Sequence, residues 1–181
     1  MFGLFKKKKV TYEMKAVVDG AVVPMTEATD PVFSSCALGN GVVIRPTSDV
    51  IVAPADGTVT VTMDGSNHAI GLELTGGLEV LIHIGVDTVN LKGEGFEALA
   101  KTGDKVKAGD ELIRFEREAL EAKGYCMEIM QIVMEGEHSG DVQYTTGVTA
   151  KAERRSWESG SKSQSKRRQE KSACLFFDGK Y

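Results

Sequence analysis

Two of the three histidines in the chain, His68 and His83, lie on neighbouring segments of a predicted β-hairpin. The apolar segments Asn67–Leu74 and Leu78–Gly85 are joined by a Thr-Gly-Gly turn at residues 75–77. Residues that face each other in an antiparallel hairpin have numbers with a constant sum, so a two- or four-residue loop places His68 opposite His83. Their Cβ atoms are then expected roughly 4.5–5.5 Å apart. A three-residue loop would break this pairing.

Two imidazoles in contact support several kinds of chemistry. A neutral imidazole is a nucleophile near physiological pH, so one ring can accept a phosphoryl group. The second ring can donate a hydrogen bond to the phosphoryl oxygens and stabilise charge during transfer. The same pair can supply two ligands of a zinc site. Two histidines satisfied within a β core, with no catalytic role, are the structural alternative, and spacing alone does not separate these interpretations.

The segments that must position the pair have the pattern of an all-β protein. Short apolar or alternating segments end at Asp-Gly, Gly-Asn-Gly and Gly-Gly turns, which favours an antiparallel β-sandwich or barrel. Besides the hairpin, strands are predicted at residues 16–23, 41–45, 50–53 and 58–63, and one more at 142–149. One or two short helices are predicted, at Gly95–Lys101 and Arg117–Lys123. No apolar run reaches the roughly 20 residues needed to cross a bilayer.

The net charge of −4 hides an uneven distribution. Residues 1–9 carry four lysines and no acidic residue, residues 10–150 carry 9 basic and 22 acidic residues, and residues 151–181 carry 9 basic and 4 acidic residues. We therefore expect a Lys-rich extension over residues 1–12, one β domain over residues 13–150, and a basic, low-complexity, disordered tail over residues 151–181. The acidic domain argues against nucleic acid as its partner.

Several strings of the β domain fit one known family. Residues 81–89 have the sequence Leu-Ile-His-Ile-Gly-Val-Asp-Thr-Val, and Leu-Lys-Gly-Glu-Gly-Phe follows at residues 91–96. With Asp-Pro-Val-Phe at 30–33 and Asn-His-Ala at 67–69, they resemble the glucose-type IIA component (EIIA type 1) of the bacterial phosphoenolpyruvate-dependent sugar phosphotransferase system. The resemblance covers about residues 16–125. It implies an antiparallel β fold and a phosphotransferase component that acts through a phosphohistidine.

The resemblance also implies roles for single residues. His83 would be the phosphoacceptor, modified on Nε2, and His68 the second histidine, needed to pass the group on. Ser66 falls where the family often has a hydroxyl residue. Asp87 lies within the signature, either with a catalytic role or as a turn or surface acid. Four apolar residues are candidates for a partner-binding rim, with plain β core as the alternative: Val32, Phe33, Ile70 and Ile84.

The implied partners are the small carrier HPr, which donates the phosphoryl group, and the IIB domain of a sugar permease, whose cysteine receives it. No cofactor and no intrinsic metal are implied, although His68 and His83 can be ligands of a zinc ion at a protein–protein interface. Regulatory proteins that bind according to phosphorylation state are a further expected class of partner, and such binding is the main alternative function. The expected location is the cytoplasm, in keeping with three widely spaced, reduced cysteines, with at most peripheral membrane contact by the N-terminal lysines.

The C-terminal part departs from the family pattern. Residues 127–134 are Met-Glu-Ile-Met-Gln-Ile-Val-Met in place of a Thr-Pro-Val-Val-type strand, and the later family strands are not recognisable. Natural divergence and a change of reading frame both give this pattern, and both put activity in question. Two rival interpretations are weaker. A zinc peptidase needs a third ligand, for which only His138 remains, and a biotinyl or lipoyl carrier domain needs a lysine where this hairpin has histidines.

Overall fold

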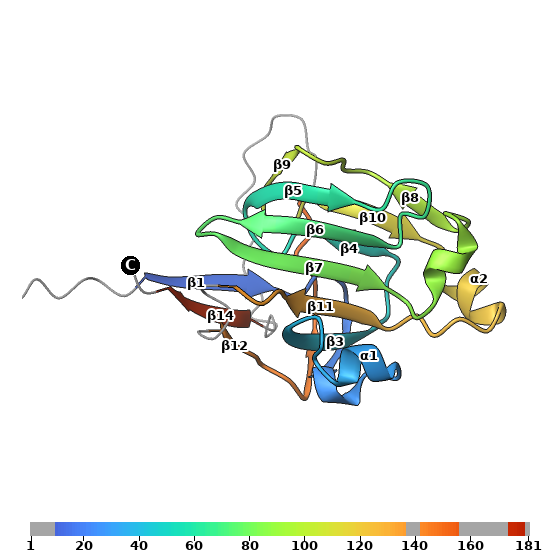
Figure 1. Ribbon diagram of the computed structural model, residues 1–181, viewed down its shortest axis with the longest axis horizontal. Coiled ribbons are helices and arrows are strands. Elements are labelled where there is room, and N and C mark those ends of the chain that lie inside the picture. The colour runs from blue at the N-terminus through green and yellow to red at the C-terminus, as the bar shows by residue number, and fades with distance from the viewer. Residues whose placement is uncertain (1–9, 137–141, 156–173, 180–181) are drawn as a thin grey trace, which may run out of the picture.

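The computed structural model describes residues 10–136, 142–155 and 174–179, and this part is built mainly from antiparallel strands (Figure 1). Eight strands form the main sheet, in the order β13-β2-β3-β11-β7-β6-β5-β9. Their bounds are β2 Gly20–Pro24, β3 Asn40–Pro46, β5 Gly57–Thr62, β6 Ala69–Leu74, β7 Leu78–Ile84, β9 Lys105–Val106, β11 Ile129–Val133 and β13 Val148–Ala150. The antiparallel β fold expected from the sequence is confirmed.

Two three-stranded sheets and a few short helical turns complete the described fold. One sheet has the order β4-β10-β8 and the other the order β1-β14-β12. Their bounds are β1 Val10–Lys15, β4 Val50–Val52, β8 Phe96–Ala98, β10 Glu111–Phe115, β12 Val142–Gln143 and β14 Cys174–Gly179. The helices are α1 Pro31–Ser34 and α2 Arg117–Ala122, with 3₁₀ turns η1 Met25–Glu27 and η2 Thr88–Leu91.

The main sheet buries both of its faces near β7. Successive side chains of a strand point to opposite faces, and in β7 the side chains of Leu78, Val80, Ile82 and Ile84 all lie in the large core. The other face is covered by a smaller apolar cluster, made of Met25, Ala28, Phe33, Val43, Met130 and Ile132. Leu81 packs against this smaller cluster. His83 lies on the same face of β7 as Leu81, so its ring is on the side of the smaller cluster.

The hairpin that carries the histidines has a different register from the predicted one. Leu74 pairs with Leu78, which leaves a three-residue turn, and Ala69 rather than His68 pairs with His83. The reason is local: Gly76 and Gly77 have φ values of +106° and +82°, and the Gly77 N–H closes the turn on the Leu74 carbonyl at 2.9 Å. The prediction of a two- or four-residue loop was therefore wrong.

Most predicted elements are present, with exceptions that tertiary pairing explains. The helix predicted at Gly95–Lys101 was wrong, because Phe96–Ala98 is strand β8 and pairs with β10. The helix predicted at Arg117–Lys123 is confirmed as α2. The strand predicted at residues 16–23 is correct only in its second half, β2. Apolar spacing in a short segment fits a helix or a strand, and pairing with a neighbouring strand decides between them.

Strands also form in the C-terminal part, where the sequence offered little guidance. The single strand predicted at residues 142–149 is replaced by β12 and β13, and β13 covers the edge of β2. Most of the basic tail, residues 156–173 and 180–181, lies outside the described residues. Its apolar triplet, Leu175–Phe177, falls in β14, which pairs with β1 along its whole length. Residues 151–155 are held against the β domain, since the Ala152 N–H donates to Asp19 at 2.8 Å.

The approach of β11 to β3 yields a prediction for stability. A Cβ atom placed on Gly41 would lie 2.1 Å from the Gln131 carbonyl oxygen, whereas a Cβ on Gly136 would meet nothing within 4 Å. Gly41→Ala should therefore lower the free energy of unfolding by about 3 kcal/mol, because β3 and β11 must move apart. Gly136→Ala should change it by less than about 0.5 kcal/mol. Urea unfolding measures both values, and equal effects would contradict the described strand packing.

Candidate active site

His68 and His83 meet at the end of the hairpin that carries them. Their ring centroids are 4.9 Å apart with an interplanar angle of 78°, an edge-to-face contact. Asn67 has a left-handed φ of +52°, so His68 lies just outside β6 and its side chain does not follow the alternation of the strand. The Ile84 N–H donates to the His68 carbonyl at 2.8 Å and holds the two segments together. The predicted proximity of the two histidines is confirmed, although it arises from the irregular backbone at Asn67 and not from direct cross-strand pairing.

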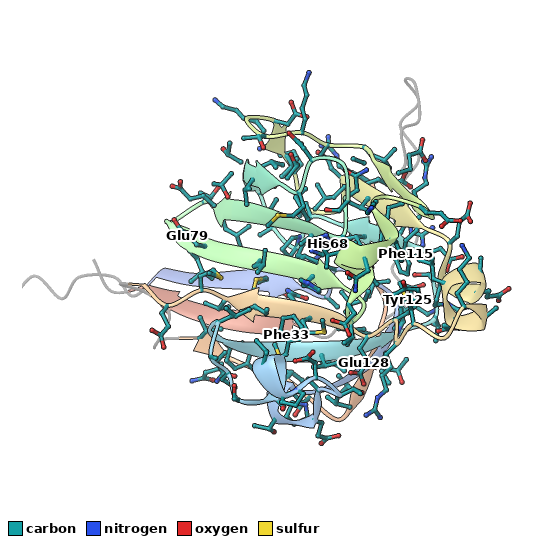
Figure 2. The ribbon with its side chains drawn as sticks, turned by 45° about the vertical axis from the view of Figure 1, so that its right-hand side comes forward. Phe33, His68, Glu79, Phe115, Tyr125 and Glu128 are labelled. Carbon is teal, nitrogen blue, oxygen red and sulfur yellow. The ribbon has the colours of Figure 1, made fainter. Side chains whose placement is uncertain are left out.

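Phe33 makes a second aromatic contact with His83. Their ring centroids are 4.9 Å apart with an interplanar angle of 54°. Phe33 and His68 come from separate parts of the chain (Figure 2). Phe33 belongs to α1, whose start is fixed by Asp30: its carboxylate accepts the Val32 N–H at 2.7 Å, and Pro31 follows as the first helical residue. An Asp before a Pro is a standard helix start. The capped turn therefore sets where the Phe33 ring lies.

The loop after β7 is fixed just as tightly. Gly85 has a φ of +73°, and a Cβ there would lie 2.5 Å from the Thr88 side chain and 3.1 Å from the Cys126 carbonyl oxygen. The Gly85 N–H donates to the Glu128 carbonyl at 2.8 Å, and the Thr88 hydroxyl donates to the Ile84 carbonyl at 2.5 Å. These bonds place Asp87 and Val89 at the surface beside His83. Only glycine fits the first position of this turn without strain.

A shallow pocket of about 190 Å³ opens over the His83 ring. Its lining combines the histidine with two acidic residues and an apolar rim: Asp30, Val32, Phe33, His83, Asp87, Thr88 and Val89. Val32 and Val89 each expose 52% of their surface, which is high for valine. Sequence reasoning had not singled out Asp30, Thr88 or Val89, although the Asp-Pro pair at residues 30–31 was a signal of a helix start.

Burial keeps the His83 imidazole uncharged. Loss of solvent is the main cause that lowers the pKa of His83 from 6.5 to about 4, and the neighbouring His68 lowers it further. The Gly85 backbone and the Asp30 carboxylate favour the charged ring, but more weakly. Nδ1 of His83 is buried and makes no hydrogen bond with any residue that the structure describes. Burial also lowers the pKa of His68, so both rings are neutral at pH 7.

Ser66, which the sequence suggested as a hydroxyl residue near the pair, contacts the His68 ring. The His68 Nδ1 and the Ser66 hydroxyl oxygen are 2.8 Å apart, and the Ser66 hydroxyl also donates to the Met63 carbonyl at 3.2 Å. Because that hydroxyl has a single proton, it accepts from an Nδ1–H of His68. The lone pair of the neutral His68 ring is then on Nε2.

Two of the apolar candidates are not at the surface. Ile70 and Ile84 are 0% exposed and lie in the large core, because their positions in β6 and β7 point inward. The prediction that they line a partner-binding rim was wrong. Val32 is exposed and Phe33 is 8% exposed, and both line the pocket over His83.

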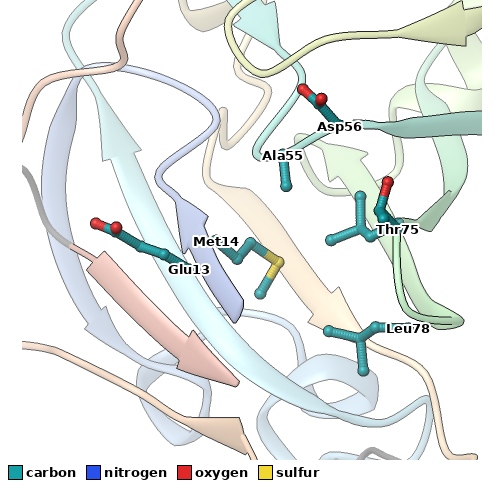
Figure 3. A pocket seen from close by; sticks show the side chains of 7 residues that line it. Glu13, Met14, Ala55, Asp56, Thr75 and Leu78 are labelled. Atoms are coloured by element: carbon teal, nitrogen blue, oxygen red, sulfur yellow. The ribbon is translucent and has the colours of Figure 1, made fainter. Parts of the chain in front are cut away.

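Histidines are absent from three other pockets of the described chain. An apolar pocket whose lining includes Met14, Ala55, Leu74 and Leu78 lies at the start of β7 (Figure 3). His83 lies near the other end of this strand. Within residues 10–136, 142–155 and 174–179, no group of three or more His, Cys, Asp or Glu residues is placed to hold a metal ion. His138 lies outside the described residues. No helix of the described part is long and apolar enough to cross a membrane.

Comparison with known proteins places this geometry in a family. Residues 12–139 match the family model described as phosphoenolpyruvate-dependent sugar phosphotransferase system, EIIA 1. The chain is 39% identical over 150 residues to the glucose-specific EIIA component of Bacillus anthracis, covering 83% of this chain and 90% of that protein. It is 41% identical over 130 residues to the glucose-specific EIIBCA component of Corynebacterium glutamicum, covering 72% of this chain and 19% of that protein.

A solved structure agrees with these sequence matches. The glucose permease IIA from Mycoplasma capricolum superposes with a TM-score of 0.65 and 31% sequence identity, covering 75% of this chain and 86% of that chain.

The contact of Phe33 with His83 yields a prediction for pH dependence. Phe33→Ala should move the titration midpoint of the His83 ring upward from about 4 towards 6.5, because water then reaches the charged form. Val32→Ala, on the same turn but exposed, should leave the midpoint unchanged. Histidine ring signals in NMR spectra recorded against pH give both values. A midpoint near 6.5 in the unaltered protein would show that His83 is not buried as described.

The same shift has a consequence for stability. The folded protein has the lower His83 pKa, so the unfolded chain binds this proton first as the pH falls. The part of the free energy of unfolding that depends on an uncharged His83 is fully present above about pH 6.5. It is lost as the pH falls towards 4.

Proposed function

The chain belongs to the EIIA 1 family of the phosphoenolpyruvate-dependent sugar phosphotransferase system, and we propose that His83 is the residue on which it carries the phosphoryl group. Its function is that of a glucose-type phosphocarrier component of this system. The observation that supports His83 is its position, since a neutral, half-buried imidazole lies at the base of a pocket with a second imidazole in contact. We further propose glucose as the sugar whose uptake it serves, after the names of the relatives in Bacillus anthracis and Corynebacterium glutamicum.

In the proposed first step, His83 attacks with Nε2. Nδ1 is enclosed by protein, so Nε2 is the nitrogen left for a partner's phosphoryl group. A proton on the enclosed Nδ1 leaves the lone pair on Nε2. The bond between phosphorus and the donor's histidine nitrogen breaks as the bond between phosphorus and Nε2 of His83 forms. A pKa near 4 keeps this lone pair available at physiological pH.

His68 acts in the second step. The phosphoryl group places about two negative charges beside a ring whose pKa is lowered only by burial, so the ring gains a proton on Nε2. The protonated ring donates a hydrogen bond to a phosphoryl oxygen, while Ser66 keeps its orientation. When the phosphorus–nitrogen bond breaks and a cysteine thiolate of the receiver binds the phosphorus, this contact stabilises the transferred charge.

The rim of the pocket fits the proposed partners. Val32 and Val89 offer apolar contact around His83, and Asp30 and Asp87 add negative charge to the same opening. Such a surface suits a partner with an apolar patch and basic side chains, and we propose HPr as the donor and a IIB domain as the receiver. The EIIBCA name of the Corynebacterium glutamicum relative supports a IIB domain as receiver. We propose that these exchanges occur in the cytoplasm without a cofactor.

Phosphoryl-transfer assays with the upstream proteins of the system test this function. Incubated with phosphoenolpyruvate, enzyme I and HPr, the protein should acquire acid-labile phosphate, and His83→Ala should abolish it. Glu79→Gln, an exposed change on the same face of β7, should behave like the unaltered protein. Acid-stable phosphate, or labelling that survives His83→Ala, would refute the proposal.

The role of His68 has its own test. His68→Gln should still be phosphorylated on His83, because Nε2 of His83 remains the nucleophile. Delivery to a IIB domain should slow by about 100-fold or more, since one donor to the transferring group is lost. Single-turnover transfer from the purified phosphoprotein measures this rate. A variant that delivers phosphate at the normal rate would show that His68 has no part in the second step.

A further inference from the structure

Glu128 is a buried acidic residue outside the pocket, and its bonds reach Thr29 and Gly85, which lie close in the chain to residues that line the pocket. It immediately precedes β11 and exposes only 8% of its surface (Figure 2). One carboxylate oxygen accepts the Thr29 N–H at 2.9 Å, and the other lies 3.5 Å from Nε of Arg45. Its backbone carbonyl accepts the Gly85 N–H at 2.8 Å. One residue therefore bonds to the loop after His83 and to the segment that leads into α1.

The bond to Thr29 acts on the start of α1. Thr29 directly precedes Asp30, whose carboxylate caps the turn that carries Phe33. A carboxylate that holds the Thr29 amide therefore fixes the point at which this turn leaves the sheet. Arg45 compensates the buried charge, and the backbone of Glu128, one residue before β11, is held by the Gly85 N–H. The chain of contacts runs from the strand to Glu128, to Thr29 and to the Phe33 ring on His83.

We propose that Glu128 is a positioning residue for phosphoryl transfer, which holds the Asp30–Phe33 turn in register with His83. This inference rests on the function proposed for His83 and extends it to a residue that never meets the phosphoryl group. Without its carboxylate, the Thr29 N–H has no acceptor, and the turn moves away from the site. The side of the pocket rim formed by Asp30, Val32 and Phe33 then moves, while His83 keeps its place in β7.

Variants of Glu128 test the proposal through two readouts. Glu128→Ala should raise the KM for phospho-HPr by about tenfold and change kcat by less than about twofold, because the lost interaction concerns docking. It should also weaken the NMR cross-peaks between the Phe33 and His83 rings. Glu128→Gln retains an amide oxygen for the Thr29 N–H, so both readouts should return to within about twofold of the unaltered protein.

Asp110 provides a matched control. Its carboxylate accepts the Lys107 N–H at 2.8 Å and lies 3.3 Å from Arg155, and its carbonyl accepts the Ala53 N–H at 2.9 Å. Asp110→Ala removes the same kinds of bond at a distance from the pocket. It should lower stability yet leave the KM and the ring contact unchanged. If Asp110→Ala raised the KM as Glu128→Ala does, general loss of stability would explain both results and the proposal would fail.

A second variant keeps the test decisive if Glu128→Ala does not fold. Thr29→Pro removes the donor N–H, and the preceding Ala28 already has φ −59° and ψ 140°, which suits a residue before proline. It should reproduce the higher KM and the weaker ring contact. An unchanged ring contact and KM in the folded variants, or a Glu128→Gln protein as impaired as Glu128→Ala, would overturn the proposal. The ring contact is measured without any phosphoryl transfer, so this result stays separate from a failure of the proposed function.

Discussion

β7 is paired on both sides, with β6 and with β11, and the rest of the site depends on this double pairing. A strand held by two neighbours cannot shift without breaking both sets of backbone hydrogen bonds, so His83 has a fixed place between Ala69 and Met130. The two rings that contact His83, those of Phe33 and His68, come from outside β7. The sheet thus fixes the position of the proposed nucleophile, and the loops supply its surroundings.

The surroundings meet two opposing demands. In the proposed function, the site must keep water away from a labile phosphorus–nitrogen bond, yet it must expose the same nitrogen to two different proteins. The structure encloses Nδ1 of His83 and lowers the pKa of the ring, while the pocket above it stays shallow and open. In this proposal, exposed valines at the rim let a partner complete the enclosure at the moment of transfer. A deep cavity would bury the group well but would exclude both partners.

The sequence predicted the strands and the meeting of the two histidines better than it predicted their geometry. Alternation and glycine turns are local signals, and they located the strands from Gly41 to Gly85 with small errors at the ends. The register of the hairpin depended on the φ angles of Gly76 and Gly77, which the sequence leaves open. Glu128 gave no signal, because its partners Thr29 and Gly85 are far away in the chain and only folding brings them together. Likewise, the pairing of β14 with β1 joins segments at opposite ends of the described chain.

The start of β6 at Ala69 limits which sequence changes this hairpin can accept. In the observed register, the position of His68 lies opposite Ile84, whose side chain is in the large core. One more residue of regular strand would turn the His68 imidazole into that core, away from the other histidine. The position at which this strand begins is therefore as constrained as the identity of a side chain. Insertions or deletions in this hairpin are therefore compatible with the paired imidazoles only where they leave the irregular step at Asn67 intact.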